Sequence, residues 1–407
     1  MKKQEDEKMK YVVVLGDGMA DCPIKELGDK TPLEYADTPM MDELAKVSEI
    51  GMAKTIPEGM KPGSDTANLA VMGYDPKKYY TGRSPLEALS IGVDMKDTDV
   101  AIRCNIVTVS DEEENYEDKN MIDHSSSEIS TEDAEILLKA VMEEMQNETY
   151  QFYVGTSYRH CLIWNQGQVV ELTPPHDILE RRIGDYLPED SVLRQMQKRS
   201  YEILSQHPLN IERKKKGLNP ANSLWFWGAG TRPALDSFEG KYGKKGVMIS
   251  AVDLLKGIAV GAGLTNVIVP GANGGLHTNY EGKAQAAVDA LTKKGYDFAY
   301  IHVEAPDEMG HQGSVERKVQ AIQYLDQRVI RLVKEQLDAS GEPYRLLILP
   351  DHPTPICVRT HTSDPIPYLL YDSTVDETHM WKYCETEAEK SGRMFEKGYE
   401  LMAYLLR

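Results

Sequence analysis

The stretch Arg345-Leu346-Leu347-Ile348-Leu349-Pro350-Asp351-His352-Pro353-Thr354 places a carboxylate and an imidazole directly after an apolar run. Residues 345–349 are typical of a short buried strand. His361 follows soon afterwards in Arg359-Thr360-His361-Thr362. An Asp and a His side by side where a strand ends, with another His nearby, form an incomplete set of metal ligands. The missing ligands are therefore expected elsewhere in the chain.

Two other apolar runs end in the same way. Residues 298–303 (Phe-Ala-Tyr-Ile-His-Val) precede Asp307 and His311, and residues 11–15 (Tyr-Val-Val-Val-Leu) precede Asp17. In a parallel sheet the carboxyl ends of the strands share one edge, and ligands bind at that edge. We therefore expect these side chains to converge with those that follow residue 349.

Length and charge narrow the function classes. The 407 residues suggest two or three domains, and 41% hydrophobic with 27% charged residues is ordinary for a globular protein. The net charge of −19 argues against nucleic acid or an acidic membrane as a partner, because phosphate would be repelled over most of the surface. A small anionic substrate is compatible only with a locally positive site, made by metal ions or clustered Arg and Lys.

The cysteines and the apolar runs indicate the compartment. The five cysteines are scattered, without a Cys-x-x-Cys pair, which favours free thiols in a reducing environment. We see no secretory signal and no run of the ~20 apolar residues that a membrane span needs. We therefore expect a cytoplasmic protein, a monomer or a small homo-oligomer.

The order of predicted elements indicates two domains. Strand and helix patterns alternate in residues 1–98 and again in 242–407, where a long helix over 314–337 carries one apolar face. This alternation predicts an α/β core assembled from both ends of the chain. Residues 99–241 interrupt it with an alternating strand near 99–109, an acidic loop and a helix over 130–146, and we expect them to form an inserted domain.

Ser64 stands in Lys61-Pro62-Gly63-Ser64, a turn just before a predicted helix. The simplest interpretation is an N-cap serine. A nucleophile would favour the same position, because the helix dipole and backbone donors stabilise an anionic oxygen there.

Taken singly, each candidate ligand is more simply a turn, cap or buried polar residue. Together the candidates predict a metal centre: Asp17, Ser64, Asp307, His311, Asp351, His352 and His361. Mixed carboxylates and imidazoles suit Mn, Zn, Co or Fe better than Ca or an all-oxygen Mg site. These groups are too many for one tetrahedral ion, so we expect two divalent ions, which can clamp a phosphoryl transfer at a separation of ~3.5–4 Å. One ion would hold Ser64 as an alkoxide.

These motifs resemble the 2,3-bisphosphoglycerate-independent phosphoglycerate mutases of archaeal type, within the alkaline phosphatase superfamily. The matching segments span nearly the whole chain in order: Leu15-Gly16-Asp17-Gly18-Met19-Ala20-Asp21, Gly63-Ser64-Asp65-Thr66-Ala67-Asn68-Leu69, Gly82-Arg83-Ser84-Pro85-Leu86-Glu87-Ala88, Ile249-Ser250-Ala251-Val252-Asp253-Leu254-Leu255-Lys256-Gly257, Ala305-Pro306-Asp307-Glu308-Met309-Gly310-His311 and Asp351-His352-Pro353-Thr354-Pro355. The resemblance implies a doubly wound core sheet with helices on both faces and an inserted α+β domain.

The resemblance also implies roles for individual residues. One ion would bind Asp307, His311 and His361, and the other would bind Asp17, Ser64, Asp351 and His352. Ser64 would be phosphorylated, with Lys256 near the transferred group. Mn is the expected metal, with Zn, Co or Mg as alternatives, and no 2,3-bisphosphoglycerate is needed. The inserted domain would bind the glycerate through His124, Arg159, His160, His176, Asp177 and Arg232.

The implied activity is an isomerase of glycolysis and gluconeogenesis. Ser64 would take the phosphoryl group from 3-phosphoglycerate, and the 2-hydroxyl of the bound glycerate would take it back. An alternative keeps this machinery but transfers the group to another small acceptor, such as homoserine. A non-catalytic metal-binding relative is the third hypothesis.

Overall fold

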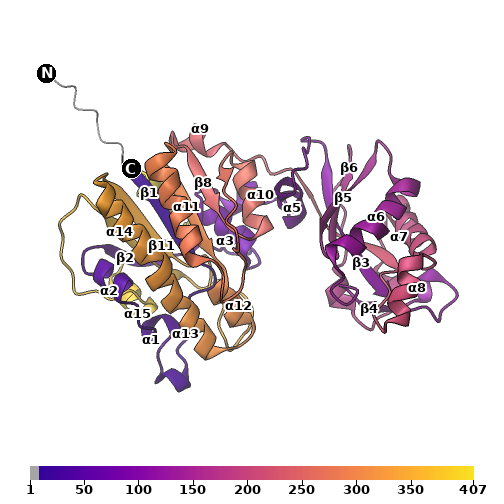
Figure 1. Cartoon of the computed structure of the whole chain (residues 1–407), viewed down its shortest axis with the longest axis horizontal. Helices are drawn as coiled ribbons and strands as arrows, with labels where there is room; N and C mark the ends of the chain where they lie inside the picture. The colour runs from indigo at the N-terminus through magenta and orange to yellow at the C-terminus, as the bar shows by residue number, and fades with distance from the viewer. Residues whose placement is uncertain (1–8) are drawn as a thin grey trace. The chain divides into compact units, whose positions relative to one another are not determined.

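A computed structural model describes residues 9–407; residues 1–8, which begin the first predicted core segment, lie outside this range. The chain forms two compact units, coloured along the sequence in Figure 1. The first contains residues up to Tyr80 together with Leu235–Arg407, and the second is Thr81–Ala234. These divisions differ from the boundaries that we placed after residues 98 and 241.

The first unit is organised around β1 (Lys10–Gly16), whose burial is complete along its length. It lies between β10 (Phe298–Val303) and β11 (Tyr344–Leu349) and is parallel to both, so that Leu15 is level with His302 and with Leu349. The eight-stranded sheet has the order β13-β2-β12-β11-β1-β10-β8-β9. Its other strands are β2 (Glu49–Ala53), β8 (Gly246–Ile249), β9 (Thr265–Asn266), β12 (Ile366–Asp372), which is antiparallel to its neighbours, and β13 (Met394–Phe395).

Helices cover both faces of this sheet. One face packs against α11 (Tyr280–Lys293) and the long helix formed by α13 (Val315–Tyr324), a π-helical segment (Leu325–Ile330) and α14 (Arg331–Ser340). On the other face, Tyr300 of β10 reaches α3 (Ser64–Val71), which packs against α10 (Asp253–Gly261). The predicted α/β class is therefore confirmed. Figure 1 shows α11 and α14 lying side by side along the strands.

The remaining helices of the first unit are short. They are α1 (Pro32–Tyr35), α2 (Pro39–Ala45), α4 (Pro76–Tyr79), α9 (Phe238–Tyr242), α12 (Ala305–His311), α15 (Glu385–Lys390) and α16 (Glu400–Leu405). Among residues 9–407, no helix has both the length and the apolar character that a membrane crossing requires.

The second unit has a five-stranded sheet in which β3 is the shared strand. The strands are β3 (Val100–Val109), β4 (Met121–Asp123), β5 (Tyr150–Thr156), β6 (Arg159–Trp164) and β7 (Ser223–Thr231), and β4, β6 and β7 all pair with β3. The helices are α5 (Arg83–Ser90), α6 (Thr131–Met145), α7 (Ser191–Leu204) and α8 (Pro208–Lys215).

Helix α5 explains why the second unit begins at Thr81 rather than near residue 99. The Ser84 hydroxyl donates a hydrogen bond to the carbonyl of Gly228 in β7. Glu87 forms an ion pair with Arg103 of β3, with Oε2 2.9 Å from Nε. The helix is thus fastened to the inserted sheet, although it precedes that sheet's first strand in the sequence.

A buried cation ties together the loops that leave β1 and β11. Lys318 of α13 places Nζ 2.8 Å from Asp21 Oδ2, and it donates to the carbonyls of Ala20 at 3.2 Å and Thr354 at 2.9 Å. The Lys318 side chain is 0% exposed and that of Asp21 is 1% exposed. A fully buried pair that also bonds both backbones fixes the relative position of the two loops.

Replacing Lys318 with Met should therefore destabilise the protein strongly, by about 3–5 kcal/mol, because the Asp21 charge stays buried without its partner. Thermal denaturation followed by circular dichroism measures the effect. Lys139→Met removes an exposed pair with Glu135 and should cost at most about 1 kcal/mol. Equal melting temperatures for the two variants would contradict this structural role.

Candidate functional site

The loops after β1, β10 and β11 bring acidic and imidazole side chains to one edge of the parallel strands. Asp17 follows β1, Asp307 lies in α12 just after β10, and Asp351 and His352 follow β11. The possible ligand atoms form two groups, and within each group all of them lie within 4.8 Å of one another. The first group is Asp307, His311 and His361, and the second is Asp17, Asp307 and His352. Asp307 belongs to both groups, so the two candidate metal sites are adjacent.

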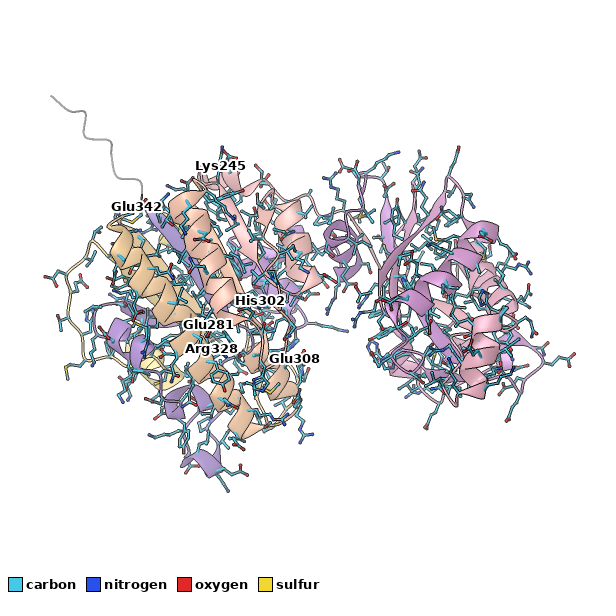
Figure 2. The ribbon with its side chains drawn as sticks, viewed as in Figure 1. Lys245, Glu281, His302, Glu308, Arg328 and Glu342 are labelled. Atoms are coloured by element: carbon cyan, nitrogen blue, oxygen red, sulfur yellow. The ribbon has the colours of Figure 1, made fainter. Side chains whose placement is uncertain are left out.

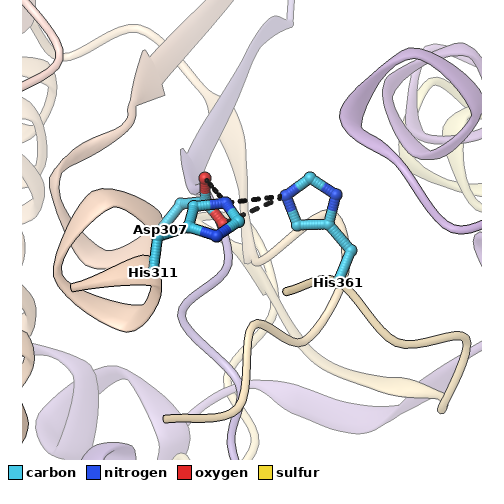
Figure 3. A group of neighbouring side chains, drawn as sticks. All are labelled: Asp307, His311 and His361. Carbon is cyan, nitrogen blue, oxygen red and sulfur yellow. Dashed lines mark hydrogen bonds and ion pairs between the residues drawn. The ribbon is translucent and has the colours of Figure 1, made fainter. Parts of the chain in front are cut away.

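The first group is drawn in Figure 3. His311 Nε2 is 3.2 Å from Asp307 Oδ2, and His361 Nε2 is 3.5 Å from Asp307 Oδ1. The two Nε2 atoms are 3.1 Å apart. His311 Nδ1 lies 2.9 Å from the carbonyl oxygen of Arg359, which can only accept, so Nδ1 carries the proton. A ring held in this way presents its Nε2 lone pair, as metal-ligating histidines do.

Without a cation, this group holds a proton. The hydrogen bond with Asp307 raises the pKa of His311 to about 9. Burial alone would raise the pKa of Asp307, but the hydrogen bonds from His311 and His361 outweigh it and hold that pKa well below its usual value. A positive charge is therefore required here, supplied either by a proton or by a metal ion.

The second group surrounds His352. Its Nε2 is 3.1 Å from Ser64 Oγ, 3.6 Å from Asp17 Oδ1 and 3.4 Å from Asp351 Oδ2. Asp17 Oδ1 is buried and accepts no hydrogen bond. Burial and the neighbouring charges of Asp351 and Asp307 raise the pKa of Asp17 well above its usual value. A divalent cation would satisfy the unpaired oxygen and relieve this repulsion, so the residues present fit such an ion.

Ser64 is the first residue of α3, with Gly63 at the N-cap position in extended backbone. Asn68, one turn later, holds it in register: its Nδ2 donates to the Ser64 carbonyl at 2.9 Å and to Asp351 Oδ2 at 2.8 Å. The Tyr300 hydroxyl in turn donates to Asn68 Oδ1 at 2.7 Å. Asn68 was not among the site residues predicted from the sequence, although its i+4 spacing from Ser64 places both on one helix face.

Gly18 and Thr354 complete the packing around the carboxylates. The Thr354 hydroxyl donates to Asp307 Oδ1, and the Gly18 N–H donates to Asp351 Oδ1 at 3.1 Å. Gly18 has φ +59°, and a Cβ at this position would collide with both Thr354 and Asp307. A glycine is therefore required where the β1 loop passes the acidic side chains.

Lys256 lies on α10 at the same edge of the sheet. Its Nζ is 3.1 Å from Asp253 Oδ1, one turn earlier in the helix. Its charge also acts on Glu304, at the end of β10. The pKa of Glu304 is raised to about 7, mainly by burial, and the charges of Lys283 and Lys256 oppose this rise. The ammonium group therefore contributes positive potential close to the acidic cluster.

In the second unit, three of the six candidate glycerate-binding residues belong to one polar patch. The His124 ring is 5.8 Å from the ring of Tyr158 and 6.2 Å from that of His176. The Arg159 guanidinium stacks on Tyr158, 4.9 Å from the ring centre. Positive or protonatable groups thus gather around an aromatic wall.

The other three candidates are placed differently. His160 pairs with Cys104 in the sheet and is 5% exposed, and burial lowers its pKa to about 4. Because successive residues of a strand point to opposite faces, Arg159 and His160 cannot both face the patch. Asp177 is exposed beside His176, with Oδ1 3.6 Å from Nε2. Arg232 donates to the carbonyl of Met95 at 2.9 Å.

The patch also contains two residues that sequence reasoning missed. Arg103 places its guanidinium 4.0 Å from the ring centre of Trp227, and Trp227 lies 5.3 Å from the His176 ring. Burial lowers the pKa of Arg103, and the charges of Arg83 and Arg159 lower it further against the effect of Glu87. An Arg inside the apolar run 100–109 was the available signal.

Comparisons with known proteins show which family the chain is similar to. A family profile described as 2,3-bisphosphoglycerate-independent phosphoglycerate mutase matches residues 45–210. The chain is 47% identical to the protein of that name from Methanosarcina acetivorans, covering 98% of this chain and 100% of the relative. It is 44% identical to a "probable" one from Geobacter sulfurreducens, with the same coverage.

Solved structures are similar over the same length. A Pyrococcus horikoshii protein superposes with a TM-score of 0.82 at 30% identity, covering 98% of this chain and 97% of that one. A cofactor-independent phosphoglycerate mutase from Thermoplasma acidophilum gives a TM-score of 0.67 at 26% identity, covering 98% and 99%.

The raised pKa of His311 predicts a pH-dependent stability of the metal-free protein. Because the folded-state pKa, about 9, lies above the ordinary histidine value of 6.5, protonated His311 stabilises the fold below pH 6.5, and this contribution is lost as the pH rises through 9. The melting temperature of the parent should exceed that of His311→Ala at pH 6, and the difference should shrink by pH 9.5. His277→Ala, at an exposed site, is the control. A difference that grows with pH would refute the assignment.

Proposed function

The chain belongs to the family of 2,3-bisphosphoglycerate-independent phosphoglycerate mutases, and we propose that it interconverts 3-phosphoglycerate and 2-phosphoglycerate through a phosphorylated Ser64. The observation that carries the proposal is the position of Ser64 Oγ, 3.1 Å from His352 Nε2 and beside the buried Asp17 and Asp351. A serine held at this place has the surroundings that a phosphoryl acceptor needs.

Two divalent cations fit the donor set of the first unit. We propose that Asp307, His311 and His361 hold one, and that Asp17, Ser64, Asp351 and His352 hold the other. When bound, such ions supply positive charge for the serine oxygen and for the transferred phosphoryl group. We propose Mn as the metal, with Zn, Co or Mg as alternatives; mixed imidazole and carboxylate donors are compatible with Mn, Zn and Co.

The protein's own groups position the serine oxygen and the phosphoryl group. Ser64 starts α3, so the positive end of the helix dipole points toward it and favours an anion there. Asn68 fixes the backbone of Ser64 relative to Asp351. Lys256, as the resemblance suggests, adds positive charge for the phosphoryl oxygens. The serine oxygen forms the new bond to phosphorus as the bond to the glycerate oxygen breaks, and the second transfer reverses this at the 2-hydroxyl.

We propose that the second unit binds the glycerate part of the substrate. Arg103, Arg159, His124 and His176 offer donors suited to a carboxylate and hydroxyls, and Trp227 and Tyr158 hold the two guanidinium groups in place. This assigns phosphoryl chemistry to the discontinuous unit and acceptor recognition to the inserted one. The buried His160 would then have a structural role.

The reaction moves one phosphoryl group between two hydroxyls of the same molecule, so it requires no 2,3-bisphosphoglycerate as a phosphate donor. The free cysteines support a reducing compartment, and we propose the cytoplasm as the location.

The alternative acceptor, homoserine, would use the same serine, and a parallel assay with a phosphate donor and homoserine separates the two activities. Formation of 2-phosphoglycerate from 3-phosphoglycerate with Mn²⁺ is the direct test.

Replacing Ser64 with Ala should abolish the conversion, lowering kcat by on the order of 10⁴-fold or more, because no oxygen is left to accept the phosphoryl group. The metal content, measured by mass spectrometry of the purified variant, should stay close to that of the parent, since the other ligands remain. Ser205→Ala, at the end of α7, is the control for serine removal. Residual turnover within tenfold of the parent would show that Ser64 is not the nucleophile.

Replacing Arg159 with Met should lower kcat/KM by roughly 10–100-fold, the loss expected for one charge-assisted hydrogen bond to the substrate. Arg182→Met removes an exposed pair with Asp118 and should leave kcat/KM unchanged. Steady-state kinetics with 3-phosphoglycerate measures both. Parent-like values for Arg159→Met would exclude this residue from glycerate binding.

A further inference from the structure

A buried histidine lies directly behind Asp17. His302 belongs to β10, and its side chain is 0% exposed; Figure 2 labels it within the first unit. Its Nε2 is 2.9 Å from Asp17 Oδ2, and its Nδ1 is 3.2 Å from the hydroxyl of Ser250, the residue that follows β8. Both ring nitrogens are therefore engaged, which leaves none to bind a metal ion.

The hydrogen-bond partners determine which nitrogen carries the proton. An ionised Asp17 carboxylate can only accept, so Nε2 donates to Oδ2. In a neutral ring Nδ1 must then accept, and the Ser250 hydroxyl supplies its hydrogen. The Val252 N–H donates to Ser250 Oγ at 3.0 Å, which orients that hydroxyl. Glu304 Oε1 lies 3.8 Å from Nδ1, too far for a hydrogen bond.

This chain of bonds leaves the two oxygens of Asp17 in different situations. Oδ2 is occupied by His302, whereas Oδ1 is buried without a hydrogen-bond partner and lies 3.6 Å from His352 Nε2. Rotation of the carboxylate would break the bond to His302 and leave its buried Nε2–H unsatisfied, which is costly. The carboxylate is therefore held in one orientation.

We propose that His302, held by Ser250, is a positioning residue that fixes the Asp17 carboxylate so that only Oδ1 faces a divalent cation. The inference rests on the proposed metal centre. Carboxylate ligands gain affinity when a second hydrogen-bonding group holds them, because the free protein has already lost the rotational freedom that binding would otherwise remove. The strand register makes this possible, since His302 is level with Leu15, two residues before Asp17.

The test is the affinity of metal-stripped protein for Mn²⁺, measured by isothermal titration calorimetry without substrate. His302→Ala should weaken the Mn²⁺-binding phase that depends on Asp17 by roughly 10–100-fold. His302→Gln, whose amide N–H can replace Nε2–H, should recover most of that loss. Ser250→Ala, which removes only the second bond, should weaken Mn²⁺ binding several-fold. His277→Ala, at an exposed site, is the matched control and should bind as the parent does.

The variants separate positioning from a purely structural role. A purely structural role would lower the melting temperature in EDTA equally for His302→Ala and His302→Gln. The Mn²⁺ affinity would then not depend on whether residue 302 carries an N–H donor. Parent-like Mn²⁺ affinity in His302→Ala, or equal losses for Ala and Gln, would overturn the proposal. If His302→Ala does not fold, Ser250→Ala becomes the test, and parent-like Mn²⁺ affinity in that variant would overturn the proposal. A parent that binds no Mn²⁺ would instead remove the metal centre itself, and this inference with it.

Discussion

Three buried carboxylates, those of Asp17, Asp307 and Asp351, lie within one small volume at the end of the central strands, and their mutual repulsion is the constraint on which the site depends. Burying one ionised carboxyl is costly, and neighbouring like charges increase the cost. The fold offsets it with donors: Gly18 and Asn68 for Asp351, Thr354 and His311 for Asp307, and His302 for Asp17. The compensation is incomplete at Asp17 Oδ1, and a cation is the natural remaining partner.

The architecture holds these charges together by connecting segments far apart in sequence. Parallel pairing of β1 with β10 and β11 places the three acidic loops side by side, and Lys318 connects two of them through Asp21 and Thr354. Helix α3 adds Ser64 from the other face through Asn68 and Tyr300. The bonds of Asn68 to Asp351 and Tyr300 are buried, so the position of the serine relative to the acids is set by the folded core rather than by a mobile loop.

The sequence was sufficient to predict that Asp17, Asp307 and Asp351 lie together, because each follows an apolar run and parallel strands end at one edge. The sequence was insufficient to predict the contact of His302 with Asp17, because His302 lies inside an apolar run. Only the strand register shows that His302 is level with Leu15, two residues before Asp17. In the second unit, the limit was strand alternation: Arg159 and His160 are neighbours in sequence but lie on opposite faces, and only the pairing with β3 shows which one is buried. Helix α5 could not be assigned to that unit from its sequence, because its contacts are with strands that come later in the chain.

The distribution of charge limits how a small anionic substrate can bind. A chain of net charge −19 repels small anions over most of its surface, so binding requires local reversal of the potential. In the first unit the side chains around Ser64 are mainly acidic, so this reversal needs metal cations in addition to the ammonium group of Lys256. In the second unit, Arg103 and Arg159 carry positive charge, and each guanidinium group lies over an aromatic ring. A phosphorylated hydroxy acid carries two separate anionic groups, one suited to metal ions and one to guanidinium donors. Under the proposed function, metal ions would bind the phosphoryl group and guanidinium groups of the second unit would bind the carboxylate.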